Sequence, residues 1–455
     1  MNLYSYFSRF SGKRILVLGL GVSNRPLVRI LLSCGLDVTA CDKTPREKLS
    51  DEVLELERDG LKLKLGEDYL SDLSADVVFR TPGILPTRPE LHALEKSGAL
   101  ITSEMEAFFE LCPCRTIGVT GSDGKTTTTT MISEMLKAAG KRVFLGGNIG
   151  TPLLPLADEM TPEDIAVVEL SSFQLMDMRR SPDVAVVTNL APNHLDMHGS
   201  MEEYVEAKKQ IFLHQTENGL LILNRDNAAT EALSAEAKGS IRRFSRTEKE
   251  GTDVFFDGET IFRGNTPLLR REEILLPGIH NVENYMAAIC AVEGLVPDDC
   301  IRTVAKSFGG VEHRIELVRV KDGVSFYNDS IASSPSRTIA GLNSFSEKVI
   351  LIAGGYDKQI SYDVLGSEIC KHVKTLVLTG ATAPKIRQAV LDAIPNAASA
   401  PEIRAEDDFY KAIHTAAACA RPGDIVLFSP ASASFDRFTN FMVRGNEFKK
   451  TVRQL

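Results

Sequence analysis

The stretch Gly118-Val119-Thr120-Gly121-Ser122-Asp123-Gly124-Lys125-Thr126-Thr127 decides the fold, because it joins an apolar strand to a helix-compatible segment over residues 128–139. A strand, a glycine-rich turn, a Lys-Thr pair and a helix, in this order, are typical of loops that bind nucleotide phosphates. The glycines let backbone N–H groups converge on anionic oxygens. Lys125 can reach the outer phosphates, and the Thr126 hydroxyl can bind Mg²⁺. We therefore predict a phosphate-binding loop.

One position departs from the standard phosphate-loop pattern. That pattern places a glycine five residues before Gly124, where this chain has Val119. The loop is therefore not that of an ordinary GTPase or kinase. The motif alone leaves one alternative open, a glycine-rich turn between strand and helix that binds nothing.

The composition is typical of a soluble globular protein with several domains. The chain has 455 residues, of which 43% are hydrophobic and 25% charged, and two to four domains are expected. The net charge of -9 argues against a nucleic-acid partner. The sequence predicts no signal peptide and no membrane insertion. The eight cysteines are scattered, with only Cys112 and Cys114 close together, so we expect reduced thiols in the cytoplasm.

Alternating strand and helix signals predict an α/β protein of three domains, over residues 1–112, 113–312 and 313–455. The first domain is Rossmann-like, with an apolar strand, a glycine turn, a helix and a second strand that ends at Asp42. Its dinucleotide fingerprint is weak, because Asn24 replaces the third glycine.

The second predicted domain is a phosphate-loop domain with a mostly parallel sheet. Apolar runs over residues 165–169 and 184–189 read as buried parallel strands, and turn signals over residues 253–277 predict an inserted β-meander. The third domain has three more apolar runs separated by helical segments, which predict another Rossmann-like sheet.

Several polar residues at predicted strand and helix ends are candidates for chemistry in the second domain. Glu169 ends an apolar strand and suits Mg²⁺ coordination, although a surface or capping glutamate explains it equally well. His194 could bind a metal or a phosphate, but a lone histidine is more often structural. Lys208 could be an exposed helical lysine. Asn281 and Asn284 lie at the start of a helix, and capping explains only one of them.

Four polar turns follow strands in the third domain. They contain Arg314, Asp329, Lys358 and Ser434. Each alone could be turn chemistry, but together they predict a ligand-binding edge.

These segments occur in the order seen in the Mur ligases, and the chain resembles that family over nearly its whole length. The resemblance rests on the phosphate loop with its Val119, the His194 segment and residues 147–150, 169–174, 280–284, 312–314, 328–330 and 354–358. Within the family, residues 17–23 and 429–436 are most similar to the members that add D-glutamate.

The resemblance implies an ATP-dependent amide ligase of peptidoglycan precursor synthesis. It would add D-glutamate to UDP-N-acetylmuramoyl-L-alanine through an acyl phosphate. The implied catalytic residues are Lys125, Asn148, Glu169, His194, Lys208 and Arg314. The implied ATP-binding residues are Gly121, Ser122, Asp123, Gly124, Lys125, Thr126, Thr127, Asn281, Asn284, Arg314 and Asp329.

The resemblance also implies two Mg²⁺ ions and two further binding sites. The metal ligands would be Thr126, Glu169, His194 and Lys208, the last as a carbamate. The UDP-sugar would contact Val22, Ser23, Asp42, Lys43, Thr81, Pro82, Gly83, Asn148 and Ser171, so the first domain would hold UDP and not a nicotinamide. D-glutamate would contact Ser333, Lys358, Ser434 and Phe441. We expect a monomer.

One residue departs from the pattern of many D-glutamate-adding members. They carry a lysine after Asn-Asp-Ser, where this chain has Ile331. Arg337, or Lys358 alone, would then supply the missing positive charge. Three alternatives stay open, namely a related ligase that adds another amino acid, a phosphate-loop kinase, and a non-catalytic protein that binds nucleotide sugars.

Overall fold

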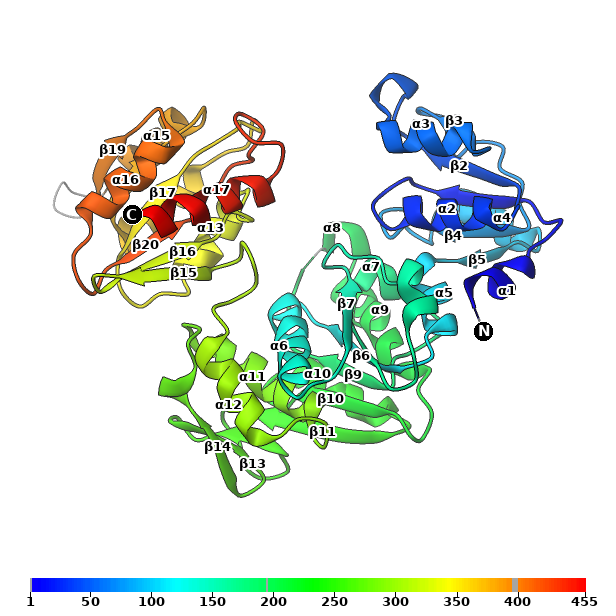
Figure 1. The fold of residues 1–455 in the computed structure, drawn as a ribbon, viewed down its shortest axis with the longest axis horizontal. Coiled ribbons are helices and arrows are strands. Elements are labelled where there is room, and N and C mark those ends of the chain that lie inside the picture. The colour runs from blue at the N-terminus through cyan, green and yellow to red at the C-terminus, as the bar shows by residue number, and fades with distance from the viewer. Residues whose placement is uncertain (1, 194, 395–399) are drawn as a thin grey trace. The chain divides into compact units, whose positions relative to one another are not determined.

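The computed structural model describes residues 2–193, 195–394 and 400–455 and contains three β-sheets with flanking helices (Figure 1). The chain divides into two compact units. The first is Met1–Glu273 with His280–Val304, and the second is Ile274–Ile279 with Ala305–Leu455. The first unit holds two of the sheets, so the domain limits at residues 112 and 312 stay a prediction.

The first sheet is parallel throughout. Its order is β3 (Lys62–Leu65), β2 (Val38–Asp42), β1 (Ile15–Leu18), β4 (Val77–Arg80) and β5 (Leu100–Thr102). All residues of β1 and β4 are buried, as expected for strands that helices cover on both faces. The helices of this segment are α1 (Leu3–Ser8), α2 (Asn24–Ser33), α3 (Asp51–Arg58), α4 (Pro89–Lys96) and α5 (Glu104–Leu111), with a short 3₁₀ turn at Arg46–Lys48.

The second sheet has nine strands. Their order is β14 (Thr266–Arg270), β13 (Thr260–Arg263), β12 (Val254–Phe256), β11 (Ser240–Ser245), β10 (Leu220–Asn224), β9 (Val184–Val187), β6 (Arg115–Thr120), β8 (Ile165–Glu169) and β7 (Val143–Gly147). The strands from β12 to β7 pair in parallel. β12, β13 and β14 pair in antiparallel fashion at one edge, which confirms the meander predicted over residues 253–277.

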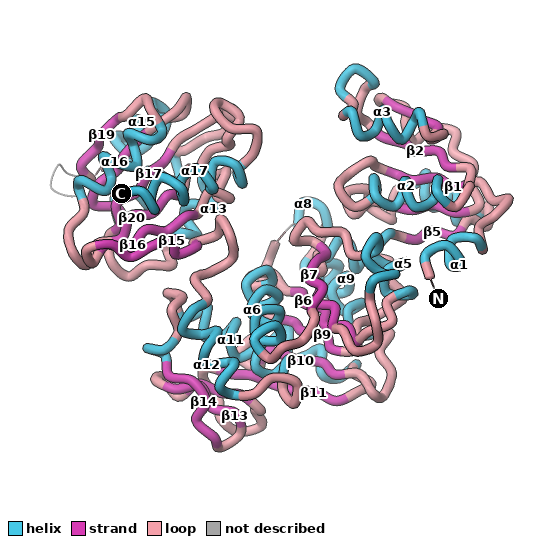
Figure 2. The backbone as a smooth tube through the Cα atoms, viewed as in Figure 1, coloured by secondary structure: helices cyan, strands magenta, loops and turns pink. Residues whose placement is uncertain are grey.

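Helices and 3₁₀ turns connect the strands of the second sheet (Figure 2). The helices are α6 (Lys125–Ala138), α7 (Ser172–Leu175), α8 (Leu195–His198), α9 (Met201–Leu213), α10 (Ala228–Glu231), α11 (Ile279–Val292) and α12 (Asp298–Ser307). The 3₁₀ turns are Leu154–Glu159, Ala232–Glu236 and Arg271–Glu273. One apolar cluster contains Phe7 and Phe108 from the first sheet's helices with Leu154 and Leu175 from the second's, so these two sheets share a core.

The third sheet lies in the second compact unit. Its order is β15 (Glu316–Lys321), β16 (Val324–Asn328), β20 (Ile425–Phe428), β17 (Val349–Ala353), β18 (Val373–Leu378) and β19 (Glu402–Ala405). Only β15 is antiparallel to its neighbour. Its helices are α13 (Pro335–Leu342), α14 (Asp363–His372), α15 (Ala383–Ala393), α16 (Phe409–Cys419) and α17 (Phe441–Gln454). Among the described residues of the whole chain, no helix has the length and apolar character to span a membrane.

Candidate active site

The carboxyl ends of β6, β7 and β8 meet at one edge of the second sheet. Glu169, the last residue of β8, pairs with Val119 of β6 and with Gly147 of β7. The loops that follow neighbouring parallel strands converge where the strand order reverses, and α/β proteins bind ligands there. This edge therefore collects the phosphate loop, Glu169 and Asn148.

The phosphate loop runs from the end of β6 to the start of α6, and its shape requires two glycines. Gly121 and Gly124 have φ angles of 148° and 77°, which residues with side chains rarely adopt. A Cβ atom on Gly121 would lie 1.9 Å from Thr188 Oγ1, and one on Gly124 would lie 2.3 Å from Asn284 Oδ1. The loop therefore packs closely against two neighbouring segments and leads into a helix N-terminus, which favours anions.

Residues after β9 hold this loop in place. Asn189 accepts hydrogen bonds from Ser122 N through its carbonyl and from Asp123 N through Oδ1, both at 2.9 Å. The Thr188 hydroxyl donates to the carbonyl of Asp123 at 2.6 Å. The loop backbone is thus fixed by the protein itself, which is the preorganisation that electrostatic catalysis needs. Neither Thr188 nor Asn189 is among the site residues predicted from the sequence.

The lysine and threonines of the loop lie where the motif predicts them. Lys125 Nζ donates to the carbonyls of Gly121 at 3.0 Å and Ser122 at 2.9 Å, so its ammonium group lies along the loop. Thr126 and Thr127 belong to the first turn of α6 and are half-buried. This arrangement is suited to binding the outer phosphates of a nucleotide.

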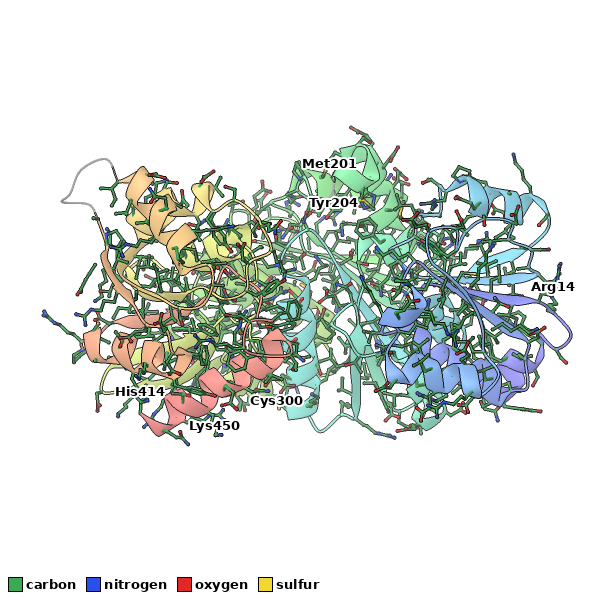
Figure 3. The ribbon with its side chains drawn as sticks, turned by 90° about the horizontal axis from the view of Figure 1, so that it is seen from above. Arg14, Met201, Tyr204, Cys300, His414 and Lys450 are labelled. Carbon is green, nitrogen blue, oxygen red and sulfur yellow. The ribbon has the colours of Figure 1, made fainter. Side chains whose placement is uncertain are left out.

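Lys208 lies on α9 and reaches the same loop. Its side chain is buried, with 1% of the residue exposed, and Nζ donates to Gly121 O at 2.9 Å and to Thr120 Oγ1 at 3.2 Å. Nζ also lies 4.7 Å from the ring centre of Tyr204, a residue of the same helix that is labelled in Figure 3. The structure therefore excludes the exposed helical lysine that composition allowed.

Burial lowers the pKa of Lys208 well below its usual value, and the positive charge of Lys125 lowers it further. The carboxylates of Glu169 and Asp123 oppose this shift without cancelling it. A buried amine beside another cation favours its neutral form, which is nucleophilic.

One carboxylate oxygen of Glu169 accepts a hydrogen bond, and the other has no hydrogen-bond partner among the described residues. Asn148 Nδ2 donates to Oε1 at 2.7 Å, and Asn148 N donates to the carbonyl of Glu169 at 2.9 Å. Oε2 is buried and has no hydrogen-bond partner among the described residues. A buried carboxylate oxygen that lacks a donor is costly unless a ligand satisfies it. This oxygen fits a divalent cation that also binds phosphate oxygens.

The donor set suits Mg²⁺ in particular. Among the described residues, no three His, Cys, Asp or Glu side chains gather into a metal cage. Mg²⁺ is usually held by one or two carboxylates, waters and substrate phosphates. Glu169 and the Thr126 hydroxyl at the helix start are ligands of that kind. His194, the other predicted metal ligand, lies outside the described residues.

A cavity of ≈ 330 Å³ brings several predicted site residues together. Its lining includes Pro82 and Gly83 from the turn after β4, and Ser171 at the start of α7. It also includes Lys125, Asn148, Ser172, Phe173, Asn193, Met197, Tyr204 and Lys208. The predicted sugar-nucleotide turn and the phosphate loop therefore line one space.

The remaining predicted UDP contacts lie at the carboxyl ends of β1, β2 and β4. Asp42 accepts hydrogen bonds from Leu20 N at 2.7 Å and Thr44 N at 2.8 Å. Burial raises its pKa, but these hydrogen bonds outweigh burial, and the net pKa is lowered. Asn24, which weakened the dinucleotide fingerprint, is buried and donates to Gly19 O at 2.8 Å. This hydrogen bond therefore stabilises the turn, and Asn24 makes it from the position where the dinucleotide pattern has its third glycine.

The other predicted UDP contacts at this edge are partly or fully accessible. Val22 and Lys43 are exposed, whereas Ser23 and Thr81 are half-buried. A Cβ atom on Gly19 would lie 2.6 Å from Thr81 Cγ2, so the turns after β1 and β4 touch.

Asn281 and Asn284, on α11, are packed against the phosphate loop. Asn284 Oδ1 lies 3.2 Å from Thr128 Oγ1, and Asn284 Nδ2 donates to Asn281 Oδ1 at 3.1 Å. Both asparagines therefore support the loop, and their contact with adenine stays a prediction.

Asp329, Ser333, Lys358 and Ser434 follow β16, β17 and β20, which are neighbours in the sheet of the second unit. Arg314 lies just before β15 and not after a strand, which corrects the prediction, and Phe441 begins α17. Tyr356 and Ala433 form a β-bridge that joins the turn carrying Lys358 to the turn carrying Ser434. Lys358 is exposed and Ser434 is buried. Arg314, Ser333 and Phe441 are half-buried.

Asp329, which directly follows β16, is a buried acid. Its Oδ2 accepts a hydrogen bond from Ser429 Oγ at 2.7 Å. The net pKa of Asp329 is raised to about 7, because burial outweighs the lowering effects of Ser429, Ile315 N and the charges of Arg314 and Arg337.

A buried arginine holds these turns together. Arg444 donates to Ser330 Oγ at 3.1 Å, to Ser330 O at 2.9 Å and to Ala433 O at 2.8 Å. Ser330 Oγ in turn donates to the carbonyl of Phe441 at 2.8 Å. Burial lowers the pKa of Arg444 to about 10. Arg444 is not among the site residues predicted from the sequence, although it lies on the buried face of α17 with Phe448 and Val452.

Comparisons with known proteins found two matching family models and several similar proteins. Residues 119–292 match the Mur ligase middle domain, and residues 313–432 match the Mur ligase glutamate ligase domain. A protein of Acetivibrio thermocellus named UDP-N-acetylmuramoylalanine–D-glutamate ligase is 50% identical over 100% of this chain and 99% of its own. A protein of Ruminiclostridium cellulolyticum with the same name is 49% identical over 97% of both chains.

Two solved structures share the fold. The UDP-N-acetylmuramate-alanine ligase of Thermotoga maritima has a TM-score of 0.59 and 17% identity, covering 97% of this chain and 99% of that one. A MurF ligase of Thermotoga maritima, solved in complex with ADP, has a TM-score of 0.54 and 21% identity. That comparison covers 97% of this chain and 95% of the other.

Proposed function

The chain belongs to the Mur ligase family, and we propose that it uses ATP to join D-glutamate to UDP-N-acetylmuramoyl-L-alanine. One structural observation carries the proposal. The cavity that Pro82 and Gly83 line also contains Lys125, Asn148 and Lys208, so a sugar nucleotide and the ATP phosphates can meet there.

The proposed reaction has two steps. The carboxylate of the L-alanyl group attacks the γ-phosphorus of ATP, and the bond to ADP breaks to leave an acyl phosphate. The amine of D-glutamate then attacks the acyl carbon, the tetrahedral intermediate expels phosphate, and the amine loses a proton. The first step requires positioning and charge neutralisation more than covalent help from the protein.

The phosphate loop would carry out most of that positioning. The N–H groups at the start of α6 and the ammonium of Lys125 would bind the β- and γ-phosphates. Asn148, whose amide also holds Glu169 Oε1, would contact the reacting acyl group. Thr126 and Glu169 would hold one Mg²⁺. Lys208, as a carbamate, and His194 would hold a second Mg²⁺. Bound Mg²⁺ would supply neutralising charge to the phosphoryl oxygens.

The second unit would bind the other substrate groups. Lys358, Ser333, Ser434 and the backbone of Phe441 would hold D-glutamate, and Arg314 and Asp329 would contact ATP. Arg444 would support Ser434 in this role through its hydrogen bond to the preceding residue, Ala433. It would support Phe441 indirectly, because it donates to Ser330 Oγ, which donates to the carbonyl of Phe441. We further propose that the protein works as a cytoplasmic monomer, which light scattering of the purified protein would test.

The test of this function is phosphate release from ATP in the presence of UDP-N-acetylmuramoyl-L-alanine and a panel of amino acids. We expect release with D-glutamate and not with its L-enantiomer. Release with another amino acid alone would assign a different ligase. Release without any amino acid would indicate a kinase or an ATPase, and binding without release would indicate a non-catalytic protein.

Arg337 is expected to supply the positive charge that Ile331 does not. Its Nη1 donates to the carbonyl of Ile331 at 3.2 Å, so the guanidinium lies beside that position. A charged hydrogen bond contributes about 1.5–3 kcal/mol. Arg337→Ala should therefore raise the KM for D-glutamate about tenfold or more in steady-state assays.

The matched control is Arg387→Ala, which removes an exposed arginine from α15. It should leave the KM values for ATP, UDP-N-acetylmuramoyl-L-alanine and D-glutamate unchanged. An unchanged D-glutamate KM in Arg337→Ala would instead assign the charge to Lys358 alone.

A further inference from the structure

Arg80 is a buried arginine whose five N–H bonds all have acceptors. It is the last residue of β4, and 1% of its side chain is exposed. Nε donates to Asp177 Oδ2 at 2.9 Å and Nη2 to Asp177 Oδ1 at 2.5 Å, which makes a bidentate ion pair. Nη1 donates to Ile84 O at 2.6 Å and Thr81 O at 3.2 Å, and Nη2 also donates to Phe173 O at 3.2 Å.

These acceptors come from two segments that are far apart in the sequence. The carbonyls of Thr81 and Ile84 bracket the turn that carries Pro82 and Gly83. Phe173 and Asp177 belong to α7 and the residues just after it, in the second sheet's part of the unit. One guanidinium plane therefore fixes the distance and the angle between the two segments.

The same two segments line the cavity of the proposed active site. Pro82 and Gly83 line it from the turn after β4, and Ser171, Ser172 and Phe173 line it from the start of α7. Arg80 itself is not among the lining residues. Its side chain is also too deeply buried to contact a substrate directly.

We propose that Arg80 is a positioning residue that holds the Pro82–Gly83 turn against the Ser171–Phe173 segment and so sets the width of the nucleotide-sugar end of the cavity. This inference rests on the proposed function, because it names the site's substrate class as a nucleoside-diphosphate sugar. A buried ion pair adds little net stability over an apolar pair, whereas its fork geometry specifies one arrangement. The Arg80–Asp177 pair is therefore better explained by the arrangement of the two segments that it specifies than by a gain in folding stability.

Two conservative variants test the role. Arg80→Lys keeps the charge but loses the planar fork, and Asp177→Asn keeps the shape but loses the charge. Small misplacements of a substrate can cost about a hundredfold in rate. We expect each variant to raise the KM for UDP-N-acetylmuramoyl-L-alanine about ten- to a hundredfold, while the KM values for ATP and D-glutamate change less than about threefold. The double variant should be no worse than the more damaging single variant.

Amide hydrogen exchange gives a second measurement that does not depend on activity. Arg80→Lys should speed exchange in residues 81–84 and 171–177 and leave the phosphate loop unchanged. Arg88→Lys is the matched control, because Arg88 lies in the same connection but forms an exposed pair with Glu90 at 2.9 Å. It should change neither the KM values nor the exchange.

The outcomes separate this inference from the proposed function. Wild-type protein that releases no phosphate with UDP-N-acetylmuramoyl-L-alanine and D-glutamate would overturn the function, while the exchange pattern would still test the contact. Equal increases in all three KM values would show a general structural role and overturn the inference. An unchanged KM for the nucleotide sugar with unchanged exchange would overturn it as well.

Discussion

Replacing Lys125 with alanine is expected to lower kcat by about a hundred- to a thousandfold, the cost of removing one preorganised charge-stabilising group. Its ammonium group lies along the phosphate loop, on the carbonyls of Gly121 and Ser122. In the reaction it would neutralise charge on the transferred phosphoryl group. The measurement is steady-state phosphate release at saturating ATP, so that weaker nucleotide binding does not mask the change in kcat.

Lys137→Ala is the control for this prediction. Lys137 lies near the other end of α6, where its Nζ is 2.9 Å from Glu134 Oε1 in an exposed pair. Exposed pairs contribute about 0–1 kcal/mol, so this variant should keep wild-type kcat and nearly wild-type stability. A Lys125→Ala enzyme that retains more than half of the wild-type kcat would show that the loop binds phosphate without this lysine.

The sequence predicted the elements around the site well, because their signals are local. Buried parallel strands appear as apolar runs, and the phosphate loop has fixed spacings, so Glu169 was placed correctly at the end of β8. The register that sets Glu169 beside Gly147 and Val119 depends on strand order. Strand order is a long-range property that no local pattern contains.

The contacts that shape the site were mostly missed for the same reason. Arg80 and Asp177 are 97 residues apart in the sequence, and neither lies in a motif. Asn189 clamps the phosphate loop from 66 residues away. Side-chain hydrogen bonds of this kind depend on which loops the fold brings together.

Lys208 is an exception, since a local signal for its burial was present. Tyr204, Lys208 and Ile211 follow the i, i+4, i+7 spacing of one helix face, and all three are buried. Because burying a lysine is costly, a lysine on the apolar face of a helix indicates a specific role. The exposed helical lysine that the composition allowed was therefore the wrong alternative, and the spacing of the apolar residues argues against it.

Lys208→Met is expected to fold normally and to lose at least about a hundredfold in kcat, if the lysine works as a carbamate. Methionine has a similar length and no charge, so it suits a site where burial already disfavours the ammonium form. Thermal unfolding should therefore show no loss of stability. Phosphate release should fall, because the variant lacks the anionic oxygen that would bind Mg²⁺ beside the phosphate loop.

The carbamate itself can be observed directly. The neutral amine attacks the carbon of CO₂, an N–C bond forms, and one proton is released. Protein equilibrated with ¹³C-labelled bicarbonate should show a carbamate carbon signal in the wild type and none in Lys208→Met. Lys209→Met is the control, because Lys209 is the next residue and its Nζ pairs with Glu206 at 2.5 Å and with Glu236 at 2.7 Å instead of contacting the phosphate loop. It should keep both the signal and the activity.

The pH dependence of this signal has a definite sign. Only the neutral amine adds CO₂, and the pKa of Lys208 is lowered from 10.5, first by burial and then by Lys125. The amine is therefore neutral at pH values where an ordinary lysine is protonated. The carbamate signal and the activity should both persist below the pH at which an ordinary lysine becomes protonated, and both should disappear as the pH falls through the lowered pKa. A wild-type protein that is fully active in CO₂-free buffer, with no labelled carbon at any pH, would show that Lys208 acts as an unmodified amine.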